Sequence, residues 1–327
     1  MIAALAVVLV SDADASTYRV VAYGPVWSPD GKHLAFVTHV KGTGSTPMLE
    51  VGNAGGQNAR VVYTSTDACC GGPIQWASSS LIVLDDDYTV KTVSLKTGRV
   101  TKLRLGFSDF AVSSNGRWIA GWAFSGGHSP ETIGIASVTG SGYHNLAKPT
   151  KNTDDSEPDF SPDGKQIVFA RAEGGRSSLT VAPIAGGAAR LLATSGDLPH
   201  WSPDGRWIAF VRPIVGADPG ALMIVRSSGG RPRLLVHGFF NVSPGQFSWS
   251  PDSKRLAYAT PHPELATIDL NGHRRELALG SLTALGQPQW STDGKQIAFT
   301  GRSPTPTGQR VDVYLIGADG HGLRRLA

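Results

Sequence analysis

The stretch Trp27-Ser28-Pro29-Asp30-Gly31-Lys32-His33-Leu34-Ala35-Phe36 decides the fold, because close copies of it recur along the chain. The good copies join an aromatic residue, a turn of the Ser-Pro-Asp-Gly type and an apolar run, and the copies at Trp76 and Val112 are degenerate. Proline presets φ in a tight turn, aspartate bonds back to the backbone, and glycine ends the turn without steric cost. The aromatic residue therefore ends one strand and the apolar run begins the next. The copies start at Trp27, Trp76, Val112, Phe160, Trp201, Trp249 and Trp290.

The spacing of these copies predicts the architecture. Successive copies start 36 to 49 residues apart, and a period in this range built from strands is typical of a β-propeller. Each unit also offers a third strand and, after a glycine turn, a fourth strand that usually begins with arginine. A six-bladed count would need one unit from residue 76 to 160, far longer than the others. We therefore predict an all-β, seven-bladed β-propeller with four antiparallel strands per blade.

Composition is consistent with one folded domain over residues 16–327. The 327 residues could hold two ordinary domains, but single blades cannot bury both faces and must stack together. The formal net charge is +4, and basic residues are not interleaved with aromatic ones along a groove, so we expect no nucleic-acid binding. Many bases lie in the fourth strands, where charge discourages edge-to-edge aggregation. A surface for an acidic polymer or an anionic membrane is the alternative.

The N-terminus has the pattern of a signal peptide. Residues 2–10 are an unbroken apolar run, and Ala13-Asp14-Ala15 follows as a small-x-small cleavage site. The run is too short to span a bilayer, so we expect no transmembrane segment. A positive n-region is missing, which leaves a start upstream of Met1, a tail or a buried strand as alternatives. We interpret residues 1–15 as a signal peptide and expect a periplasmic or secreted protein.

Two further segments leave alternatives open. Arg19-Val20-Val21 resembles a fourth strand with no blade before it, and could pack against the last blade to close the propeller. Cys69 and Cys70 are the only cysteines and are adjacent. In an exported protein they could form a vicinal disulfide that clasps their loop, or remain thiols.

Candidate functional side chains come from the first strand of each blade, because that strand lines the central channel of a propeller. Positions one and three before the motif's aromatic residue share a face if side chains alternate strictly along the strand. Polar groups gather at these positions in the later copies. The candidate binding residues are Asp109, Glu157, Asp159, His200, Gln246, Ser248, Gln287 and Gln289.

Three of these residues could support chemistry. Glu157, Asp159 and His200 come from adjacent units, and two carboxylates beside a histidine could hold a divalent metal or act as general acid and base. The alternative is a polar, water-filled channel without a ligand. The chain contains no Gly-x-Ser-x-Gly elbow and no His-Glu-x-x-His pair. We therefore assign no catalytic residue, and no cofactor beyond that metal.

The repeated Trp-Ser-Pro-Asp-Gly-Lys motif with its apolar run resembles the WD-like propeller repeats of the TolB family, and similar repeats occur in prolyl oligopeptidase-like peptidases. The resemblance covers residues 23–327 and specifies the fold more strongly than the function. It implies an exported, non-enzymatic scaffold that binds another envelope or extracellular protein or peptide at the channel mouth. TolB has an α/β domain before six blades, whereas the first of seven motifs here starts at Trp27. Its partners are therefore not transferred.

The favoured hypothesis is a monomeric binding protein without enzymatic activity. The alternative is a metal-assisted lyase or hydrolase that acts on a polysaccharide or ester at the central channel, since some seven-bladed propellers are lyases that use metal and histidine near the axis. In that case Glu157, Asp159 and His200 would be the metal ligands. The sequence does not identify the partner or the substrate.

Overall fold

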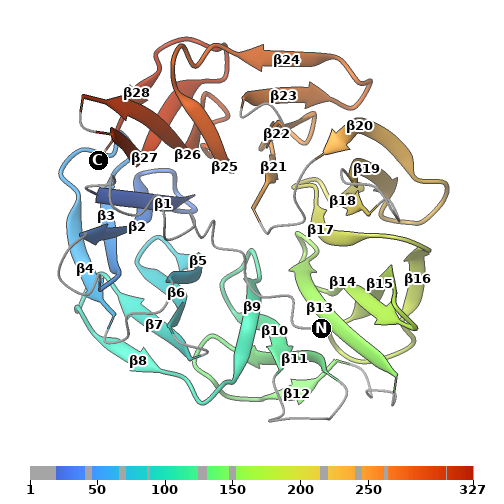
Figure 1. Ribbon diagram of the computed structural model, residues 1–327. Coiled ribbons are helices and arrows are strands. Elements are labelled where there is room, and N and C mark those ends of the chain that lie inside the picture. The colour runs from blue at the N-terminus through green and yellow to red at the C-terminus, as the bar shows by residue number, and fades with distance from the viewer. Residues whose placement is uncertain are drawn as a thin grey trace. The chain divides into compact units, whose positions relative to one another are not determined.

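The fold is a seven-bladed β-propeller with four antiparallel strands in each blade, as the repeat predicts (Figure 1). The computed structural model describes residues 20–40, 46–65, 71–86, 89–123, 131–146, 152–213, 220–239, 245–260, 264–306 and 308–326. These residues form 28 strands and no helix, so no helix in them could cross a membrane. The predicted signal peptide, residues 1–15, and the adjacent Cys69 and Cys70 lie outside the described residues.

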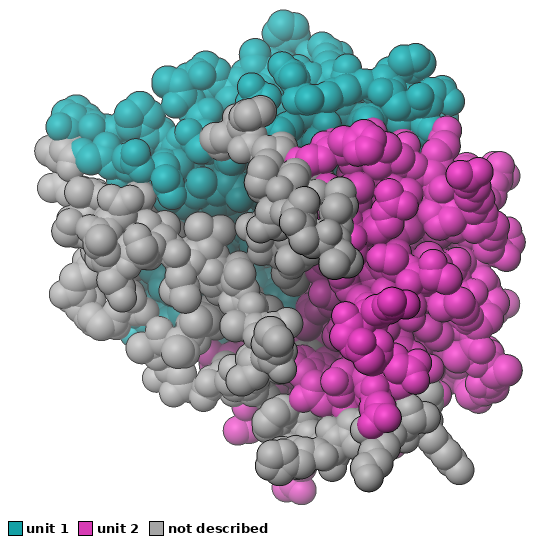
Figure 2. All heavy atoms as spheres, turned by 45° about the vertical axis from the view of Figure 1, so that its right-hand side comes forward, with its two compact units in different colours: residues 1–74, 243–327 teal, residues 75–242 magenta. Residues whose placement is uncertain are grey.

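The chain divides into two compact units, coloured separately in Figure 2. Unit 1 comprises residues 1–74 and 243–327, and unit 2 comprises residues 75–242. The two units are described one at a time below. The single-domain organisation over residues 16–327 stays a prediction.

Unit 1 holds three blades. They are β1 (Val20–Trp27), β2 (His33–Val40), β3 (Met48–Asn53) and β4 (Arg60–Thr64); β21 (Phe247–Trp249), β22 (Arg255–Ala259), β23 (Leu265–Asp269) and β24 (Arg274–Leu277); and β25 (Thr283–Trp290), β26 (Gln296–Thr305), β27 (Gly308–Gly317) and β28 (Arg324–Arg325).

Unit 2 holds four blades, except that the start of β5, residues 71–74, belongs to unit 1. They are β5 (Gly71–Ser78), β6 (Leu81–Asp86), β7 (Val90–Ser94) and β8 (Val100–Lys102); β9 (Phe107–Val112), β10 (Trp118–Ala123), β11 (Thr132–Ser137) and β12 (His144–Asn145); β13 (Thr153–Phe160), β14 (Gln166–Glu173), β15 (Arg176–Pro183) and β16 (Arg190–Ala193); and β17 (Asp197–Trp201), β18 (Trp207–Arg212), β19 (Gly220–Arg226) and β20 (Arg233–Phe239).

The turn motif is a closed set of hydrogen bonds between the first and second strands. The buried Ser28 Oγ donates to Asp30 Oδ1 at 2.7 Å and accepts from the N–H of His33 at 2.9 Å. Asp30 Oδ1 also accepts from the N–H of Lys32 at 3.1 Å, and the Gly31 N–H donates to the Ser28 carbonyl at 2.9 Å. The motif therefore repeats because each residue type satisfies one backbone group of the same turn. The same serine bonds recur at Ser113, Ser161, Ser202, Ser250 and Ser291.

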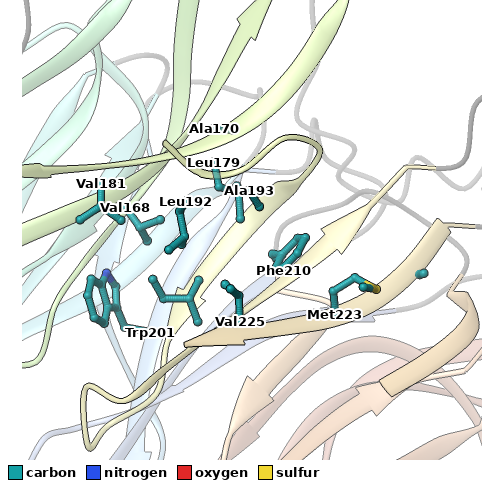
Figure 3. Close-up of a cluster of buried hydrophobic side chains, with 12 residues drawn as sticks. Val168, Ala170, Leu179, Val181, Leu192, Ala193, Trp201, Phe210, Met223 and Val225 are labelled. Carbon is teal, nitrogen blue, oxygen red and sulfur yellow. The ribbon is translucent and has the colours of Figure 1, made fainter. Parts of the chain in front are cut away.

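The hydrophobic core lies between the faces of successive blades. In unit 2, Val168 and Val181 of one blade pack in one buried cluster with Phe210, Met223 and Val225 of the next (Figure 3). The apolar runs that follow each turn supply these side chains. A blade buries one face only by stacking on its neighbour, which explains why the sequence repeats a whole blade at a time.

β1 joins two blades within unit 1. It is the first strand of its own blade, paired with β2 from Val20↔Val40 to Trp27↔Leu34, and its start also pairs in parallel with β27 at Val21↔Val311. The predicted contact of residues 20 and 21 with the last blade is therefore present, but the prediction that they form a separate fourth strand is wrong. β28 pairs only with Tyr314 and Leu315, which leaves the rest of the long β27 edge open to β1.

Arginines of three fourth strands bond to the following blade. Arg324 Nη1 of β28 donates to the Gly55 carbonyl at 2.7 Å, in the turn that follows β3. Arg190 of β16 donates in the same way to the Ser227 carbonyl after β19, and Arg275 of β24 to the carbonyl of Asp319 after β27. These arginines thus stabilise blade stacking, in addition to the protection of strand edges that the sequence predicts.

Candidate binding site on the first strands

The first strands are interrupted by a bulge close to the candidate residues. The pairing register shifts between Tyr23 and Val26 in β1, and between Ser156 and Asp159 in β13. The strict alternation of side chains that the sequence predicts therefore fails there. Non-glycine residues rarely adopt positive φ, and such strain is concentrated at functional sites. The residue three before the motif's aromatic residue has positive φ at Gly24 (65°), Asp109 (47°), Glu157 (54°), Leu198 (51°) and Gln287 (56°).

Side chains at this bulge position reach the main chain of the next blade. Glu157 Oε2 accepts from the N–H of Leu198 at 2.5 Å, so the bulge of β13 is bonded to the bulge of β17. Gln287 Oε1 accepts from the N–H of Gly24 at 2.9 Å, which makes the same connection from β25 to β1. A carboxylate and an amide thus perform the same structural task in two different blades.

The residue just before the motif's aromatic residue forms a second connection of this kind. Asp159 Oδ2 accepts from the N–H of Trp201 at 2.7 Å. Gln75 Oε1 accepts from the N–H of Val112 at 2.8 Å, while its Nε2 donates to the carbonyl of Phe110 at 2.8 Å. Sequence reasoning missed this role and left Gln75 out of the candidate set, although the recurrence of Gln, Asp and Glu at these two positions signals it.

Three carboxyl groups of unit 2 are held in poorly solvated surroundings. Burial raises the pKa of Asp109 to about 6 and that of Asp159 to about 7. Burial also raises the pKa of Glu157 to about 8, with Asp109 and Asp197 adding repulsion and the Leu198 N–H opposing it. Loss of solvent penalises the charged form of an acid, and neighbouring carboxylates add to that penalty. Near pH 7, Glu157 therefore keeps most of its proton and Asp159 keeps part of it, whereas Asp109 is mostly ionised.

His200 lies beside this group without neutralising it. Its Nδ1 is 3.9 Å from Asp159 Oδ2, and 41% of its side chain is exposed. Although part of the side chain is exposed, the surrounding protein restricts solvation of the imidazole ring, which disfavours the imidazolium and lowers the pKa of His200 to about 4. Among the described residues, neither lysine nor arginine forms an ion pair with Asp109, Glu157 or Asp159. Within the described part of the chain, no lysine or arginine therefore compensates these carboxyl groups.

The candidate residues of unit 1 are uncharged. Gln246 is only 7% exposed, and its Oε1 lies 2.7 Å from where a Cβ on Gly286 would stand. The buried Ser248 Oγ has no hydrogen-bond partner within the described part of the chain. The Gln289 carbonyl accepts from Trp27 Nε1 at 3.2 Å. Unit 1 thus places amide and hydroxyl groups where unit 2 places carboxyls.

The possible metal ligands do not form a donor set. Glu157 and Asp159 lie on β13 and His200 lies on the neighbouring β17, as the sequence predicts, but each carboxylate directs an oxygen at a main-chain N–H. Within the described residues, no group of three or more His, Cys, Asp or Glu side chains is arranged to hold a metal ion. The divalent metal therefore stays a prediction from sequence.

The raised pKa values predict how stability depends on pH. Glu157 and Asp159, with pKa values of about 8 and about 7, keep protons in the folded chain after the unfolded chain has lost them. Stability should therefore fall as pH rises from about 6.5 to 8.5, by about 1–2 kcal/mol after allowance for solvent screening. His200 is neutral throughout this interval. Urea unfolding at the two ends of this pH interval measures the change in the free energy of unfolding. That free energy should depend less on pH in the variant Glu157→Gln/Asp159→Asn.

Comparisons with known proteins support the fold. No protein-family model matches the chain, and no curated protein matches it. A solved TolB structure from Acinetobacter baumannii superposes with a TM-score of 0.55 at 18% identity, covering 80% of this chain. This chain spans 63% of the length of that TolB chain.

Two enzyme structures share the fold as well. An oligogalacturonate lyase in complex with manganese gives a TM-score of 0.67 at 14% identity, covering 90% of each chain. A puromycin-hydrolyzing peptidase of Mycobacterium tuberculosis gives 0.75 at 13% identity, covering 97% of this chain and 55% of the peptidase. Identities this low establish a shared propeller fold and no shared activity.

Proposed function

We propose that this protein is a non-enzymatic scaffold whose carboxyl groups bind positively charged groups of a protein or peptide ligand. The observation that carries the proposal is the set of Asp109, Glu157 and Asp159 on β9 and β13. These carboxyl groups are partly buried and have no lysine or arginine partner among the described residues. A ligand ammonium or guanidinium group would stabilise their ionised form and so provide the charge pairing that the described residues do not supply.

The amide residues at equivalent positions support a role for this charge in binding. Gln75 and Gln287 bond to the next blade with neutral side chains. Ionised side chains at Glu157 and Asp159 are therefore not needed for the same hydrogen bonds, and ionising these groups without a charged partner costs free energy. A cationic ligand would remove that cost, so its binding would be coupled to ionisation of the two carboxyl groups.

The uncharged residues of unit 1 suit the same class of ligand. Gln246 and Ser248 offer donors and acceptors that peptide groups can satisfy. Gln287 and Gln289 lie on β25 of the neighbouring blade, although Gln287 Oε1 already accepts from Gly24. We assign these residues to recognition of uncharged polar groups of a peptide.

We further propose that the protein is exported and acts as a monomer on another envelope or extracellular protein. The apolar run of residues 2–10 and the fold shared with TolB structures support this location and this class of partner. Rigid blades that present several polar positions suit such a role.

Binding of a lysine-rich peptide tests the proposal. Glu157→Gln/Asp159→Asn keeps the accepting oxygens and removes the charges, so we expect the dissociation constant to rise at least about tenfold. Glu264→Gln/Glu276→Gln is the matched control, because it removes two exposed carboxylates that pair with Arg274 in unit 1. Isothermal calorimetry measures the dissociation constant of the peptide for the wild type, the Glu157/Asp159 variant and the control variant. Equal affinities of the wild type and the Glu157/Asp159 variant would refute the proposal.

A metal-assisted lyase or hydrolase acting on a polysaccharide or ester is the second candidate. The likeness to an oligogalacturonate lyase solved with manganese favours it. Incubation with polygalacturonate and Mn²⁺, followed by ultraviolet absorbance of unsaturated products, tests it directly. Turnover that is lost in His200→Ala would replace the binding proposal, and no turnover would leave that proposal in place.

A further inference from the structure

The blade β17–β20 carries an arginine patch at the turn between β19 and β20. We define the patch as Arg206, Arg226, Arg231 and Arg233, all of which are exposed. Arg206 precedes β18, Arg226 ends β19, Arg231 lies in the turn and Arg233 begins β20. This surface is separate from the candidate binding residues, which lie on first strands.

Trp207 organises two of these arginines. The guanidinium carbon of Arg226 lies 4.4 Å from the centre of the Trp207 ring, and that of Arg233 lies 5.9 Å from it. The strand register enforces this arrangement, because Trp207 pairs with Arg226 and Arg233 pairs with Ile224, two residues away. Stacking on an indole ring holds a planar guanidinium in place and leaves its N–H groups available for an anion.

The positive charge of the patch is largely uncompensated. Residues 201–240 contain five arginines, no lysine and two aspartates. Among the described residues, Arg226, Arg231 and Arg233 pair with no carboxylate, and Arg206 reaches only Asp204, at 3.9 Å. Like charges held this close without a counter-ion favour binding of an anionic partner.

The patch adjoins a strand edge with which no described strand pairs. β20 is the outermost strand of its sheet and, at seven residues, is longer than the other fourth strands, which have two to five (Figure 1). Such an edge presents backbone donors and acceptors, and two register shifts opposite Leu222 interrupt their regular spacing. Leu234, Leu235 and Val236 along it are partly exposed. The edge therefore has positive charge at one end and apolar side chains along its length, and such a surface suits an extended peptide chain.

We propose that β20 and the arginine patch bind an extended acidic peptide, which adds to the sheet as a fifth strand. Its main chain would continue the β20 ladder, and its carboxylates would accept paired hydrogen bonds from Arg226 and Arg233. A polysaccharide could match the charge, but it lacks the alternating N–H and C=O groups that a strand edge recognises. The edge therefore favours a peptide.

Binding of a fluorescent peptide of alternating Glu and Val tests this proposal by anisotropy. We expect binding that weakens as salt is added, because exposed charges are screened. Arg226→Glu/Arg233→Glu should raise the dissociation constant at least about tenfold. Arg99→Glu/Lys102→Glu, at the fourth strand β8, is the matched control with the same charge change and should bind like the wild type. Equal loss in both variants would overturn the proposal.

Further measurements make the outcome decisive. A Lys-and-Val peptide should bind Arg226→Glu/Arg233→Glu better than the wild type, which also shows that the variant is folded. A backbone N-methylated acidic peptide should bind poorly, and equal binding would overturn strand addition. If polygalacturonate bound more tightly than the peptide, the proposal that a peptide occupies this surface would be overturned. Concentration-dependent dimerisation that is abolished in Arg226→Glu/Arg233→Glu would overturn it as well. Unchanged binding by Glu157→Gln/Asp159→Asn separates this surface from the first-strand site.

Discussion

Replacement of Phe210 by alanine is expected to lower the free energy of unfolding by about 3–5 kcal/mol. Phe210 is fully buried in β18 and packs in the cluster with Val168 and Leu179 of the preceding blade. The substitution removes most of the apolar surface at a junction between two blades and leaves a cavity that rigid strands cannot close. Urea unfolding of the wild type and the Phe210→Ala variant at the same pH measures the decrease in the free energy of unfolding.

Leu191→Ala is the control for this substitution. Leu191 lies in β16 of the neighbouring blade and is 61% exposed, so its truncation should change stability by less than about 0.5 kcal/mol. A comparable loss for the two variants would contradict the packing of one blade on the next that Figure 3 shows.

Gly116→Ala is expected to destabilise the protein by about 2–4 kcal/mol, from a combination of backbone strain and collision. Gly116 ends the turn of the β9–β12 blade with φ +65°, and a Cβ there would lie 1.8 Å from the carbonyl oxygen of Ala77. The obstacle is backbone of the preceding blade, so it cannot move aside as a flexible side chain could. Thermal or urea unfolding measures the loss.

Gly98→Ala separates the two contributions. Gly98 has φ +68°, but nothing lies within 4 Å of the position that a Cβ would take there, so its substitution should cost only the strain of about 1 kcal/mol. If the losses for Gly116→Ala and Gly98→Ala were equal, the close approach of turn to neighbouring blade would be refuted.

The repeated turn allowed the fold to be predicted from sequence. Ser28, Asp30 and Gly31 bond to their own turn, so their spacing records local structure directly. The degenerate copy at Val112 was recognisable because Ser113 and Asn115 keep the same bonds. Local chemistry of this kind recurs in six blades, and the aromatic residue and apolar run mark the β5–β8 blade, where Ala77 replaces the serine. A single sequence therefore contains enough information to count the blades.

The candidate site was predicted only in part. Position within the motif correctly placed Glu157 and Asp159 on β13 and His200 on the adjacent β17. The bulge at Glu157 and the hydrogen bonds to Leu198 and Trp201 were not predicted. Those features depend on where the next blade stands, and residues in successive blades are some forty positions apart in sequence.

The fourth-strand arginines show the same limit. Arg190 and Arg324 were correctly placed in outer strands from the glycine turns before them. That each donates to a carbonyl of the following blade could not be deduced, because nothing local in the chain specifies the neighbouring turn. Sequence patterns therefore located these residues and the structure identified what they contact.

Proton release on binding of a lysine-rich peptide at pH 7 tests the central claim most directly. The claim is that Glu157 and Asp159, with pKa values of about 8 and about 7, keep protons until a ligand cation arrives. Calorimetry in two buffers of different ionisation enthalpy should then show that about one proton is released per peptide bound. The variant Glu157→Gln/Asp159→Asn should release none. Tight binding without proton release, or release unchanged in that variant, would contradict the account.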